Sequence, residues 1–561
     1  MIPHKLDEKL LVCGQITPED ITQAASAGVR LVINNRPDRE ELGQPLSADL
    51  KAQAEALGIV YRHIPVSGGN FDEASVAAFG DALASFDGPA LAFCRTGTRS
   101  TTLWALSQAG SRPTAAILSA ANAAGYDLSQ LRDRIEATGA GGPDSRAIDR
   151  PAARYDVVIV GGGAGGIATA ASIHKRDSSL SIAIIEPRTD HYYQPGWTMV
   201  GAGVFDPKTT CHSMASVMPK GVTWIREAAH SFQPEQDQVT TANGSVIGYR
   251  ALVVAPGNVL DWDAIDGLAE TLGRNGVTSN YRYDTAPYTW DLVRNLREGV
   301  ALFTQPPMPI KCAGAPQKAM YLSCDNWLER GVLNNIDVAF HNAGGVLFGV
   351  KDYVPALMGY VERYGIDLNF ESTLIAVDGA AKTATFREKT GEVTRAFDMI
   401  HVTPPQIAPR FVADSPLADN AGYVEVDQVT MRHVRYPNIF GLGDGGSTPN
   451  AKTAAAARKQ APIVAVNLLS VLKGEEPVAG YDGYGSCPLT VEKGKIVLAE
   501  FGYGGKVMPS FPKWLIDGTR PARLSWLLKS EALPWVYWNG MLKGHEWLVK
   551  PQPIARVLQA A

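Results

Sequence analysis

The feature that most constrains the fold is a glycine-rich turn between an apolar strand and an alanine-rich helix. Residues 156–160 read DVVIV, residues 161–166 read GGGAGG, and residues 166–175 have the composition of a helix. In this arrangement the first glycine permits a tight turn, the second lets the backbone approach a pyrophosphate, and the third lets helix and strand pack closely. A carboxylate about 20 residues further on accepts hydrogen bonds from a ribose hydroxyl. We therefore expect a Rossmann-like α/β domain that binds a dinucleotide through Gly161, Gly163, Ala164, Gly165, Gly166 and Glu186.

Two more distant segments indicate FAD rather than a nicotinamide as that dinucleotide. They are LVVAPG at 252–257 and NIFGLGD at 438–444. Each reads as a strand that ends where the backbone can closely approach the dinucleotide. Asp444, at the end of the second segment, can offer a carboxylate to the ribityl hydroxyls of FAD. Together these segments resemble the two-dinucleotide-binding-domain flavoproteins. A second candidate strand, GVALFT at 299–304, is followed by QPPMPIKCAGAPQK. Because proline has no N–H to donate to a phosphate, we expect no tight nicotinamide site there.

Six further segments carry a closer resemblance. They are YYQPGWTMVGAG (192–203), IKCAGAPQK (310–318), HVTPPQ (401–406), KTAAA (452–456), YDGYGSCPL (481–489) and VLAEFGY (497–503). In this order they resemble the mitochondrial-type sulfide:quinone oxidoreductases over about residues 155–550. The resemblance implies FAD as cofactor, sulfide or a related thiol or persulfide as donor, a quinone as acceptor, and a persulfide on Cys312, which falls on one of the family's two catalytic cysteines. It also implies cofactor contacts from Gln194, Ala229, Gly257, Asp444 and Lys452.

The sequence departs from that family at Gly445. The family places its second catalytic cysteine directly after the aspartate of the GD pair, whereas this chain reads GDGGSTPN. A disulfide between two active-site cysteines is therefore not expected in its usual form. Cys211, Cys324 and Cys487 are conceivable substitutes, but we expect each to be a buried small hydrophobe, the commoner role of a free cysteine. Cys312, in a turn rich in glycine and proline, is the expected redox group.

A second anion-binding pattern, AFCRTGTRS, occurs at residues 92–100. Four residues separate Cys94 from Arg99, one fewer than in a tyrosine phosphatase loop, and this shorter ring is the length of rhodanese loops. LVINNRPD and IPVSGGNFDEA, earlier in the same region, nevertheless resemble a bacterial family of phosphatase-like domains assigned as sulfur transferases. We favour sulfur transfer, with Cys94 and Arg99 as its catalytic residues. A phosphatase, with Asp72 as the best candidate for its general acid, and a non-catalytic relic stay open.

Composition and apolar periodicity divide the 561-residue chain into two α/β units and a linker. The first unit is expected to have strands at 28–34 and 91–93 and helices at 45–57 and 72–86. The predicted boundaries are 1–140 for the phosphatase-like, rhodanese-like domain, 141–153 for the linker, 154–510 for the flavoprotein and 511–561 for a C-terminal amphipathic helical end. Six cysteines without CxxC spacing predict no metal site, and a net charge of −5 argues against a nucleic-acid partner.

The C-terminal end has the composition of a membrane-facing segment. Five of the chain's 11 tryptophans lie at 514–550, interleaved with the basic residues Arg520, Arg523, Lys529, Lys543 and Lys550. Aromatic and basic residues on amphipathic helices suit the bilayer interface, although an aromatic core cluster is the alternative. Phe501 and Tyr503 are the expected stacking partners of the quinone. With no signal peptide and no apolar run of about 18 residues, the expected location is the cytoplasm, with peripheral contact to the inner membrane.

Together these patterns predict a fusion enzyme of undetermined oligomeric state. Its flavoprotein takes electrons from sulfide at Cys312 and passes them through FAD to a quinone, and its N-terminal domain receives the sulfane sulfur on Cys94. Two alternatives stay open. One is an NAD(P)H-dependent FAD oxidoreductase that lost sulfide chemistry when Gly445 arose, and the other is a tyrosine phosphatase-like domain joined to a redox-sensing flavoprotein.

Overall fold

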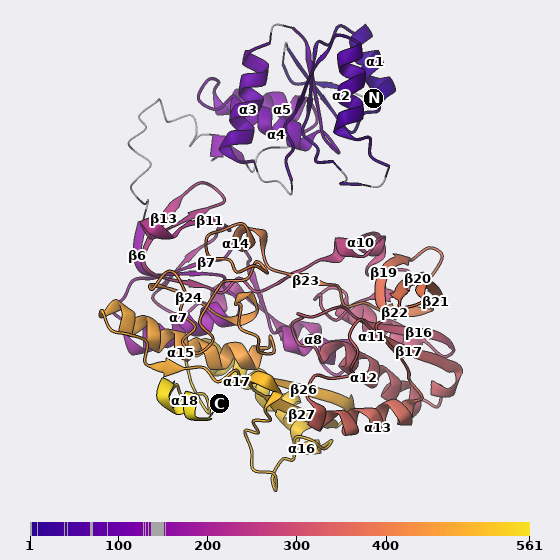
Figure 1. Ribbon diagram of the computed structural model, residues 1–561, viewed down its shortest axis with the longest axis vertical. Helices are drawn as coiled ribbons and strands as arrows, with labels where there is room; N and C mark the ends of the chain where they lie inside the picture. Colours follow the sequence, from indigo (N-terminus) through magenta and orange to yellow (C-terminus); the bar gives the residue numbers. More distant parts are fainter. Residues whose placement is uncertain are drawn as a thin grey trace. The chain divides into compact units, whose positions relative to one another are not determined.

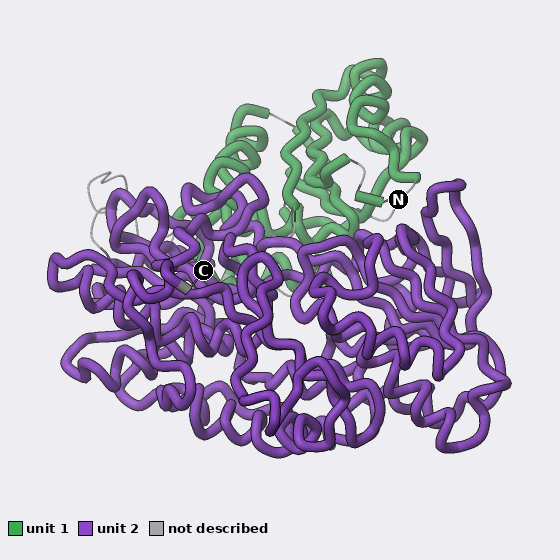
Figure 2. The backbone as a smooth tube through the Cα atoms, turned by 60° about the horizontal axis from the view of Figure 1, so that its bottom comes forward, with its two compact units in different colours: residues 1–150 green, residues 151–561 purple. Residues whose placement is uncertain are grey.

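The chain folds into two compact units. The computed structural model describes residues 3–7, 9–38, 40–41, 43–67, 71–86, 88–126, 128, 131–132, 134–135, 151 and 153–560. The units divide between residues 150 and 151, and Figure 2 colours them separately. The division falls within the segment 141–153 predicted as a linker, most of which lies outside the described residues.

The first unit is a five-stranded sheet covered by helices on both faces. Its strands lie in the order β1 (His4–Lys5), β2 (Leu10–Cys13), β5 (Ala90–Phe93), β3 (Leu31–Asn34) and β4 (Val60–His63), all parallel except β1. Its helices are α1 (Pro18–Ser26), α2 (Ser47–Ala56), α3 (Glu73–Ala84), α4 (Thr98–Ser107) and α5 (Thr114–Ala123). Apolar side chains of α1 and α2 pack on one face and those of α3, α4 and α5 on the other (Figure 1). The predicted strands and helices of this unit are thus present, and the loop after β5 lies at the carboxyl edge of the sheet.

The second unit begins with a seven-stranded sheet built around the predicted dinucleotide-binding strand. Its members are β10 (Val222–Ile225), β7 (Ile182–Ile185), β6 (Ala153–Val160), β13 (Val246–Val254), β12 (Gln238–Thr241) and β11 (Ala229–Gln233) in that order, with β24 (Ile439–Gly441) also paired to β13. β6 is buried over its last four residues and runs parallel to both β7 and β13. Helices α7 (Ala164–Arg176) and α15 (Ala454–Leu472) pack against each other beside this sheet (Figure 1).

A second sheet confirms the fold of a two-dinucleotide-binding-domain flavoprotein. Its five strands are all parallel, in the order β15 (Val277–Thr278), β22 (Met399–His401), β16 (Gly299–Gln305), β17 (Ile336–Asn342) and β18 (Asp367–Phe370). The main helices of this half are α11 (Ala286–Asn295), α12 (Ala315–Glu329) and α13 (Val354–Tyr364). An antiparallel sheet of β19 (Thr373–Asp378), β20 (Thr383–Glu388) and β21 (Gly391–Ala396) accompanies it. The segment 299–304 is therefore a strand, as predicted, and the proline-containing turn after it leads into α12.

The C-terminal part of the second unit starts with an antiparallel hairpin that packs on α12. The hairpin consists of β26 (Gly485–Glu492) and β27 (Lys495–Phe501), and its apolar face belongs to the same core cluster as α12. Helix α16 (Arg523–Leu527), the π-helical turn Leu528–Ala532 and α17 (Leu533–Asn539) then run end to end, and α18 (Ile554–Ala560) closes the chain. Among the described residues, no helix is long and apolar enough to cross a membrane.

Candidate active site

The glycine-rich turn after β6 has the backbone geometry that the sequence predicts. Gly161 has a φ of +104°, in the left-handed region, and a Cβ there would collide with the carbonyl group of Ala255. A Cβ on Gly166 would collide with the carbonyl oxygen of Gly161, so glycine lets α7 begin close to the strand. Gly163 has no atom within 4 Å of the place its Cβ would take, so this side of the turn is open. The turn therefore combines the tight and open positions that a pyrophosphate at the start of α7 requires.

Glu186 is fixed beside this turn by backbone hydrogen bonds. Its Oε2 accepts from the N–H of Gly162 (2.8 Å) and its Oε1 accepts from the N–H of Arg188 (2.9 Å). The remaining predicted loop residues, Ala164 and Gly165, form the first turn of α7. The carboxylate is thus held where the sequence pattern predicts contact with a ribose hydroxyl.

A second cluster lies at the carboxyl ends of β13 and β24, which are parallel neighbours. Burial raises the pKa of Asp444, while the charges of Lys311 and Lys452 act in the opposite direction. Lys311 Nζ donates to Gln194 Oε1 (2.7 Å), and Lys452 Nζ donates to a backbone carbonyl of the loop that follows Asp444 (2.7 Å). Gly257 ends the segment that leads from β13 to this loop, and its φ is +73°. The structure thus brings the predicted cofactor residues Gln194, Gly257, Asp444 and Lys452 to one end of the sheet.

Two buried polar atoms in this cluster have no hydrogen-bond partner among the described residues. They are Oδ1 of Asn258, directly after the segment that ends β13, and Oγ1 of Thr448, in the loop after β24. Buried polar groups are rarely left without a partner, so these atoms fit a site that a polar ligand completes. The predicted contact Ala229 is the half-buried first residue of β11, in the same sheet, and its role stays a prediction.

Cys312 lies in the turn between β16 and α12, close to this cluster. Its N–H donates to the carbonyl oxygen of Lys452 (2.8 Å), and its φ of +50° places it in the left-handed region. Its Sγ lies 3.7 Å from the Sγ of Cys487 on β26. Lys318 Nζ, from the first turns of α12, donates to the Sγ of Cys312 at 3.1 Å. Two thiols and an ammonium group from three elements therefore meet beside the loop that carries Asp444.

Hydrogen bonding and charge make the acidities of the two thiols very different. The S–H of Cys487 and the ammonium group of Lys318 hold the pKa of Cys312 well below its usual range, against the effect of burial. The hydrogen bond to Cys312 and burial raise the pKa of Cys487 well above its usual range. Burial opposes the charge of Lys318, but the neighbouring sulfurs outweigh it and raise the pKa of this ammonium. Of the two thiols, Cys312 is therefore the one whose surroundings favour the thiolate, which is the reactive form of a cysteine.

In the first unit, Cys94 begins the loop between β5 and α4 and is 1% exposed. The N–H of Gly97 donates to its Sγ (3.1 Å), and a Cβ on Gly97 would collide with the hydroxyl of Tyr126. Arg99 donates from Nη1 and Nη2 to the two carboxylate oxygens of Glu40, each at 2.7 Å. The loop thus places a backbone amide on the sulfur, and its arginine is held by a carboxylate.

Comparisons with known proteins identify both units. Residues 4–111 match the family model "Beta-lactamase hydrolase-like protein, phosphatase-like domain", and residues 155–288 match "Pyridine nucleotide-disulphide oxidoreductase". The chain is 43% identical over 398 residues to "Sulfide:quinone oxidoreductase, mitochondrial" of Dictyostelium discoideum, covering 70% of this chain and 87% of that protein. The protein of the same description from Mus musculus is 39% identical over 394 residues, covering 70% of this chain and 87% of that protein. This chain belongs to the sulfide:quinone oxidoreductase family.

Two further similarities define the extent of each unit's match. The solved sulfide:quinone oxidoreductase of Aquifex aeolicus superposes with a TM-score of 0.57 at 21% identity, covers 69% of this chain and 92% of that chain, and shares the fold. The first unit is 40% identical over 105 residues to "Beta-lactamase hydrolase-like protein" of Agrobacterium fabrum, which is 19% of this chain and 24% of that protein. The predicted family and the predicted fusion to a phosphatase-like domain are both confirmed.

This member of the family has no room for a cysteine at Gly445. A Cβ there would lie 2.8 Å from Cδ and 2.9 Å from Cγ of Pro256, closer than carbon atoms pack, and 3.2 Å from the carbonyl oxygen of Gly257. Cys487 faces Cys312 instead, so the interpretation of Cys487 as an isolated core hydrophobe is wrong. The two cysteines lie 175 residues apart in the chain, and no local pattern around Cys487 marks the contact.

The other two candidate cysteines are not part of this pair. Cys324 is buried within α12, and its pKa is raised by burial. Cys211 begins the short strand β9 (Cys211–Ser213), and burial likewise raises the pKa of its thiol. Neither has a described contact with Cys312. Cys324 is buried, as predicted, whereas Cys211 is only half-buried.

The two predicted quinone residues of this oxidoreductase lie in different surroundings. Phe501 ends β27 on the same face as Ala499, which pairs with Cys487 in the hairpin. Its ring meets that of Phe348 edge to face, with centroids 5.8 Å apart. The ring of Tyr503 packs on that of Tyr481, with centroids 5.8 Å apart, and its hydroxyl donates to a backbone carbonyl. Only Phe501 therefore lies on the side of the hairpin that carries the cysteine.

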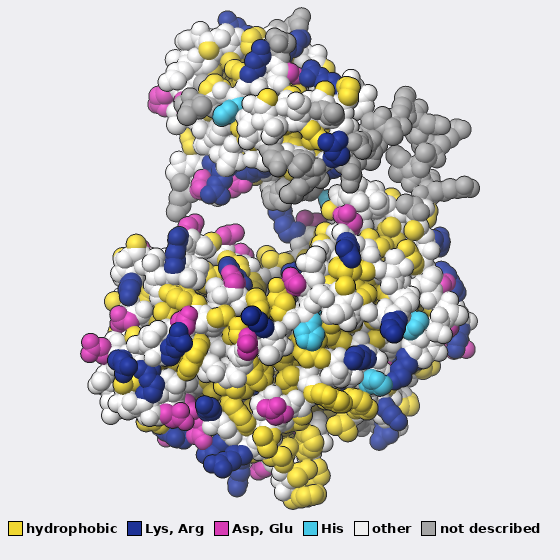
Figure 3. Space-filling model, turned by 180° about the vertical axis from the view of Figure 1, so that it is seen from behind, with side chains coloured by type: hydrophobic (Ala, Val, Ile, Leu, Met, Phe, Trp, Pro, Cys, Tyr) yellow, Lys and Arg dark blue, Asp and Glu magenta, His cyan; other side chains and the backbone are white. Residues whose placement is uncertain are grey.

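The C-terminal end of this oxidoreductase exposes several large apolar side chains. Trp514 is 84% exposed and Leu548 is 82% exposed. The exposed rings of Trp535 and Trp547 are stacked, with centroids 5.4 Å apart. Seen from behind, hydrophobic side chains gather at the lower end of the second unit, where Figure 1 places the C-terminal elements (Figure 3). This surface has the composition that the predicted membrane contact requires.

Part of the same segment is core rather than surface. Trp538 stacks on His212, with ring centroids 3.9 Å apart, as the alternative of an aromatic cluster expects. Lys529 is buried, so its predicted place among the wetted basic residues is wrong. Burial and the charge of Lys318 lower the pKa of Lys529 to about 7, and its Nζ donates to the carbonyl oxygen of Pro195 (3.4 Å). The helical end thus contributes a second amine to the region of the thiol pair.

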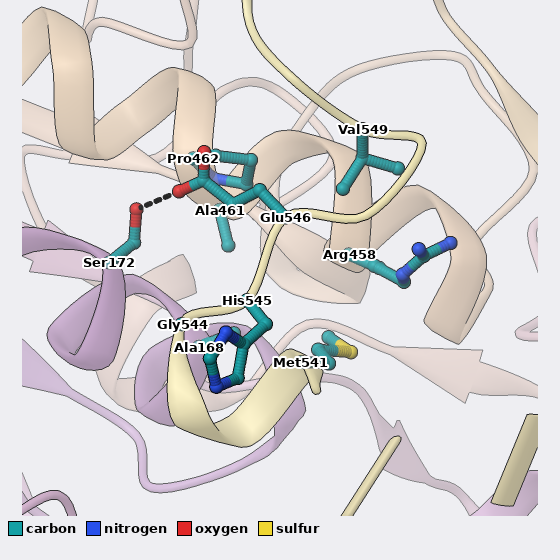
Figure 4. Close-up of a pocket in the computed structure, with 10 residues that line it drawn as sticks. All are labelled: Ala168, Ser172, Arg458, Ala461, Pro462, Met541, Gly544, His545, Glu546 and Val549. Carbon is teal, nitrogen blue, oxygen red and sulfur yellow. Dashed lines mark hydrogen bonds between the residues drawn. The ribbon is translucent and has the colours of Figure 1, made fainter. Parts of the chain in front are cut away.

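The segment after α17 is attached to helix α7 by a partly exposed ion pair. Figure 4 shows the small pocket where this segment meets α7 and α15. Glu546 accepts from the hydroxyl of Ser172 (2.8 Å) and pairs with Arg176, both on α7. Because the glycine-rich turn starts α7, the C-terminal end is fixed to the same helix as the dinucleotide site. The described residues contain no cluster of His, Cys, Asp and Glu that could hold a metal ion.

Proposed function

We propose that the second unit binds FAD, takes two electrons from sulfide through Cys312, and passes them to a quinone. The observation that carries the proposal is the partly buried contact of Lys318 Nζ with Cys312 Sγ at 3.1 Å. It maintains a thiolate in a turn that is hydrogen-bonded to the loop carrying Asp444. A thiolate is the form of cysteine that attacks or releases sulfur.

The residues around the glycine-rich turn fit FAD. Gly163 leaves the turn open, and Glu186 presents a carboxylate fixed by backbone hydrogen bonds. Asn258 and Thr448 each have a buried polar atom without a hydrogen-bond partner among the described residues. Asp444 would hold the ribityl hydroxyls, and Lys452 lies beside it. Bound FAD supplies a two-electron acceptor next to a thiolate. The chain's own residues would orient that acceptor beside the half-buried Cys312 and the buried Cys487.

An anaerobic titration of the purified protein separates this proposal from the NAD(P)H alternative. Adding sulfide alone is expected to bleach the flavin absorbance near 450 nm, on the order of one equivalent per flavin. The turn after β16 contains Pro306, Pro307 and Pro309, which lack the N–H groups of a phosphate-binding turn. NADH alone is therefore expected to leave the flavin oxidised. Bleaching by NADH and not by sulfide would overturn the proposal.

For the first unit, sulfane-sulfur transfer at Cys94 fits the loop better than phosphate hydrolysis. Gly97 directs one N–H at the Sγ, and Glu40 occupies both terminal nitrogens of Arg99 that a phosphoryl group would need. Asp72, the best candidate for a general acid, caps α3 instead, because its Oδ1 accepts from the N–H of Ser75 (2.6 Å). Labelled sulfide supplied to the full chain is expected to leave sulfur on Cys94. Hydrolysis of an aryl phosphate that is lost in Cys94→Ser would favour the phosphatase.

The exposed apolar end is proposed to rest on a membrane surface from one side. Trp514 and Leu548 would insert into the interface between lipid and water, and the rings of Trp535 and Trp547 would lie level with this interface. Co-sedimentation with vesicles of mixed zwitterionic and anionic lipids tests this contact. Replacement of Trp514 and Leu548 by Ser is expected to abolish sedimentation, whereas an unchanged bound fraction would contradict it.

A further inference from the structure

The glycine-rich turn after β6 is held by side chains from outside the strand and the helix that it joins. We propose that His191 and Tyr537 are positioning residues of the cofactor site, which orient the peptide group between Gly162 and Gly163 so that its N–H points at the pyrophosphate of FAD. This inference rests on the proposed binding of FAD and names the residues that prepare the turn for it. It makes the C-terminal end of the chain part of the cofactor site.

Both backbone groups of Gly162 are bound by side chains. Its N–H donates to Oε2 of Glu186 (2.8 Å), and its carbonyl oxygen lies 3.1 Å from Nδ1 of His191. A Cβ on Gly162 would lie 2.7 Å from Cγ of Glu186, so only glycine fits beside this side chain. The C=O and N–H of a trans peptide group point in opposite directions. Because the carbonyl group of Gly162 is directed at His191, the N–H of Gly163 is turned away from it.

The N–H of Gly163 is therefore available to an anion. It donates to no group among the described residues, and no atom lies within 4 Å of the place that a Cβ of Gly163 would take. Gly163 is also the N-cap residue of α7, where the N–H groups and the helix dipole favour a phosphate. A donor that is already oriented loses less conformational freedom when its ligand binds, so the affinity for the ligand is higher.

The two hydrogen bonds of His191 define which of its ring nitrogens carries the proton. Burial lowers the pKa of His191 to about 4, so at neutral pH the ring is neutral and has one N–H and one acceptor nitrogen. A carbonyl oxygen only accepts, so the proton is on Nδ1, which donates to Gly162. Nε2 is then the acceptor, and the hydroxyl of Tyr537 donates to it at 2.7 Å. Tyr537 thus favours the tautomer of His191 that holds the turn.

Tyr537 is itself fixed by aromatic packing on α17, 346 residues after His191 in the chain. Its ring lies against that of Tyr193, with centroids 4.8 Å apart, and meets that of Trp538 edge to face at 5.1 Å. The ring of Trp538 also meets that of His191 edge to face, at 5.8 Å. Glu546 attaches the following segment to α7, the helix that begins at the turn (Figure 4). Two contacts therefore connect the C-terminal end to the turn and to its helix.

The first test measures the affinity for FAD without relying on turnover. The full-length protein is freed of flavin, and its Kd for FAD is determined from the quenching of flavin fluorescence. Tyr537→Phe keeps the ring and removes the hydroxyl, and its Kd should rise about 2- to 12-fold, the effect of one hydrogen bond. His191→Leu leaves the carbonyl oxygen of Gly162 without a donor, and its Kd should rise about 5- to 150-fold. His191→Asn offers an amide N–H near the place of Nδ1 and should recover most of the affinity.

The second test separates a positioning role from a contribution to stability alone. A ligand raises the melting temperature by an amount that depends on its affinity, so Tyr537→Phe should reduce the difference between the melting temperatures with and without FAD. Tyr353→Phe is the matched control. Tyr353 is buried in the core cluster around α12, and its hydroxyl donates to the carbonyl oxygen of Glu500 (2.9 Å). This control should lower both melting temperatures equally and leave the Kd for FAD unchanged.

The wild type and the variants together distinguish this inference from the proposed function. Wild-type protein that binds no FAD would overturn the proposed function and this inference with it. Wild-type protein that binds FAD, with the same Kd in Tyr537→Phe, would overturn the inference alone. An equal loss of affinity in His191→Asn and His191→Leu would also contradict it, because only the asparagine offers a donor to Gly162. If His191→Leu does not fold, Tyr537→Phe still decides the result, because it keeps the packing of the ring.

Discussion

Removing the ammonium group of Lys318 is the perturbation whose outcome the geometry defines most closely. Lys318→Met keeps most of the volume of the buried side chain and deletes the donor that lies 3.1 Å from Cys312 Sγ. A hydrogen bond to a charged group contributes about 1.5–3 kcal/mol, and each 1.36 kcal/mol is a factor of ten. The thiolate of Cys312 should therefore react about 10- to 150-fold more slowly near neutral pH.

The assay follows alkylation of Cys312 by iodoacetamide in the reduced protein between pH 6 and pH 9, with peptide mass spectrometry as the readout. In the wild type the pKa of Cys312 is held low, so its rate should change little over this range. In Lys318→Met the pKa rises, so the rate should be low at pH 6 and recover as the pH increases. Lys529→Met is the comparison variant: this buried amine donates to Pro195 and makes no described hydrogen bond to either sulfur, although its charge also lowers the pKa of Cys312. We therefore expect a smaller change of the pH profile than in Lys318→Met. Identical pH profiles for Lys318→Met and wild type would refute the reasoning.

Three other changes have defined outcomes. Gly445→Ala places a methyl group 2.8 Å from Pro256 and should destabilise the second unit by about 1–3 kcal/mol. The expected signs are a lower melting temperature and loss of FAD. An unchanged melting temperature and an unchanged FAD content would contradict the packing argument. Burial lowers the pKa of His401 to about 4. The free energy of unfolding should therefore fall by up to about 3 kcal/mol as the pH drops from about 6.5 to 4. In urea unfolding measured at several pH values, His401→Gln should reduce this dependence on pH. Glu40→Gln removes the carboxylate that pairs with Arg99. Thiosulfate should then slow the alkylation of Cys94 by a factor up to about five larger than in the wild type. An unchanged effect of thiosulfate would argue against anion binding at this arginine.

The parts of the site that local sequence encodes could be predicted. A turn such as GGGAGG requires glycines at fixed places because the backbone must bend and pack closely, and Gly161 and Gly166 meet that requirement. Asp444 was found in the same way, from an apolar strand that ends in a polar turn. The buried strands are short apolar runs, and their positions agree with the prediction in both units.

The contacts that complete the site depend on tertiary structure. Cys487 lies on a hairpin strand whose alternation predicts burial but not its neighbour, and its partner Cys312 is 175 residues away. Lys529 stands in a run of aromatic and basic residues typical of a wetted surface, yet the π-helical turn directs it inward. The absence of space at Gly445 follows from Pro256, which lies in the loop after β13 and far away in the sequence. Composition and residue spacing do not indicate the neighbour of Cys487, the burial of Lys529 or the lack of space at Gly445.

The activity proposed for the second unit is the passage of electrons from sulfide to a quinone. Its most direct measurement is the anaerobic stoichiometry of the full-length protein with bound FAD, a soluble quinone, sulfide and a small thiol acceptor. One quinone is expected to be reduced and one persulfide formed for each sulfide consumed, and both products should be lost in Cys312→Ser. Quinone reduction that requires NADH and proceeds equally without sulfide would contradict it.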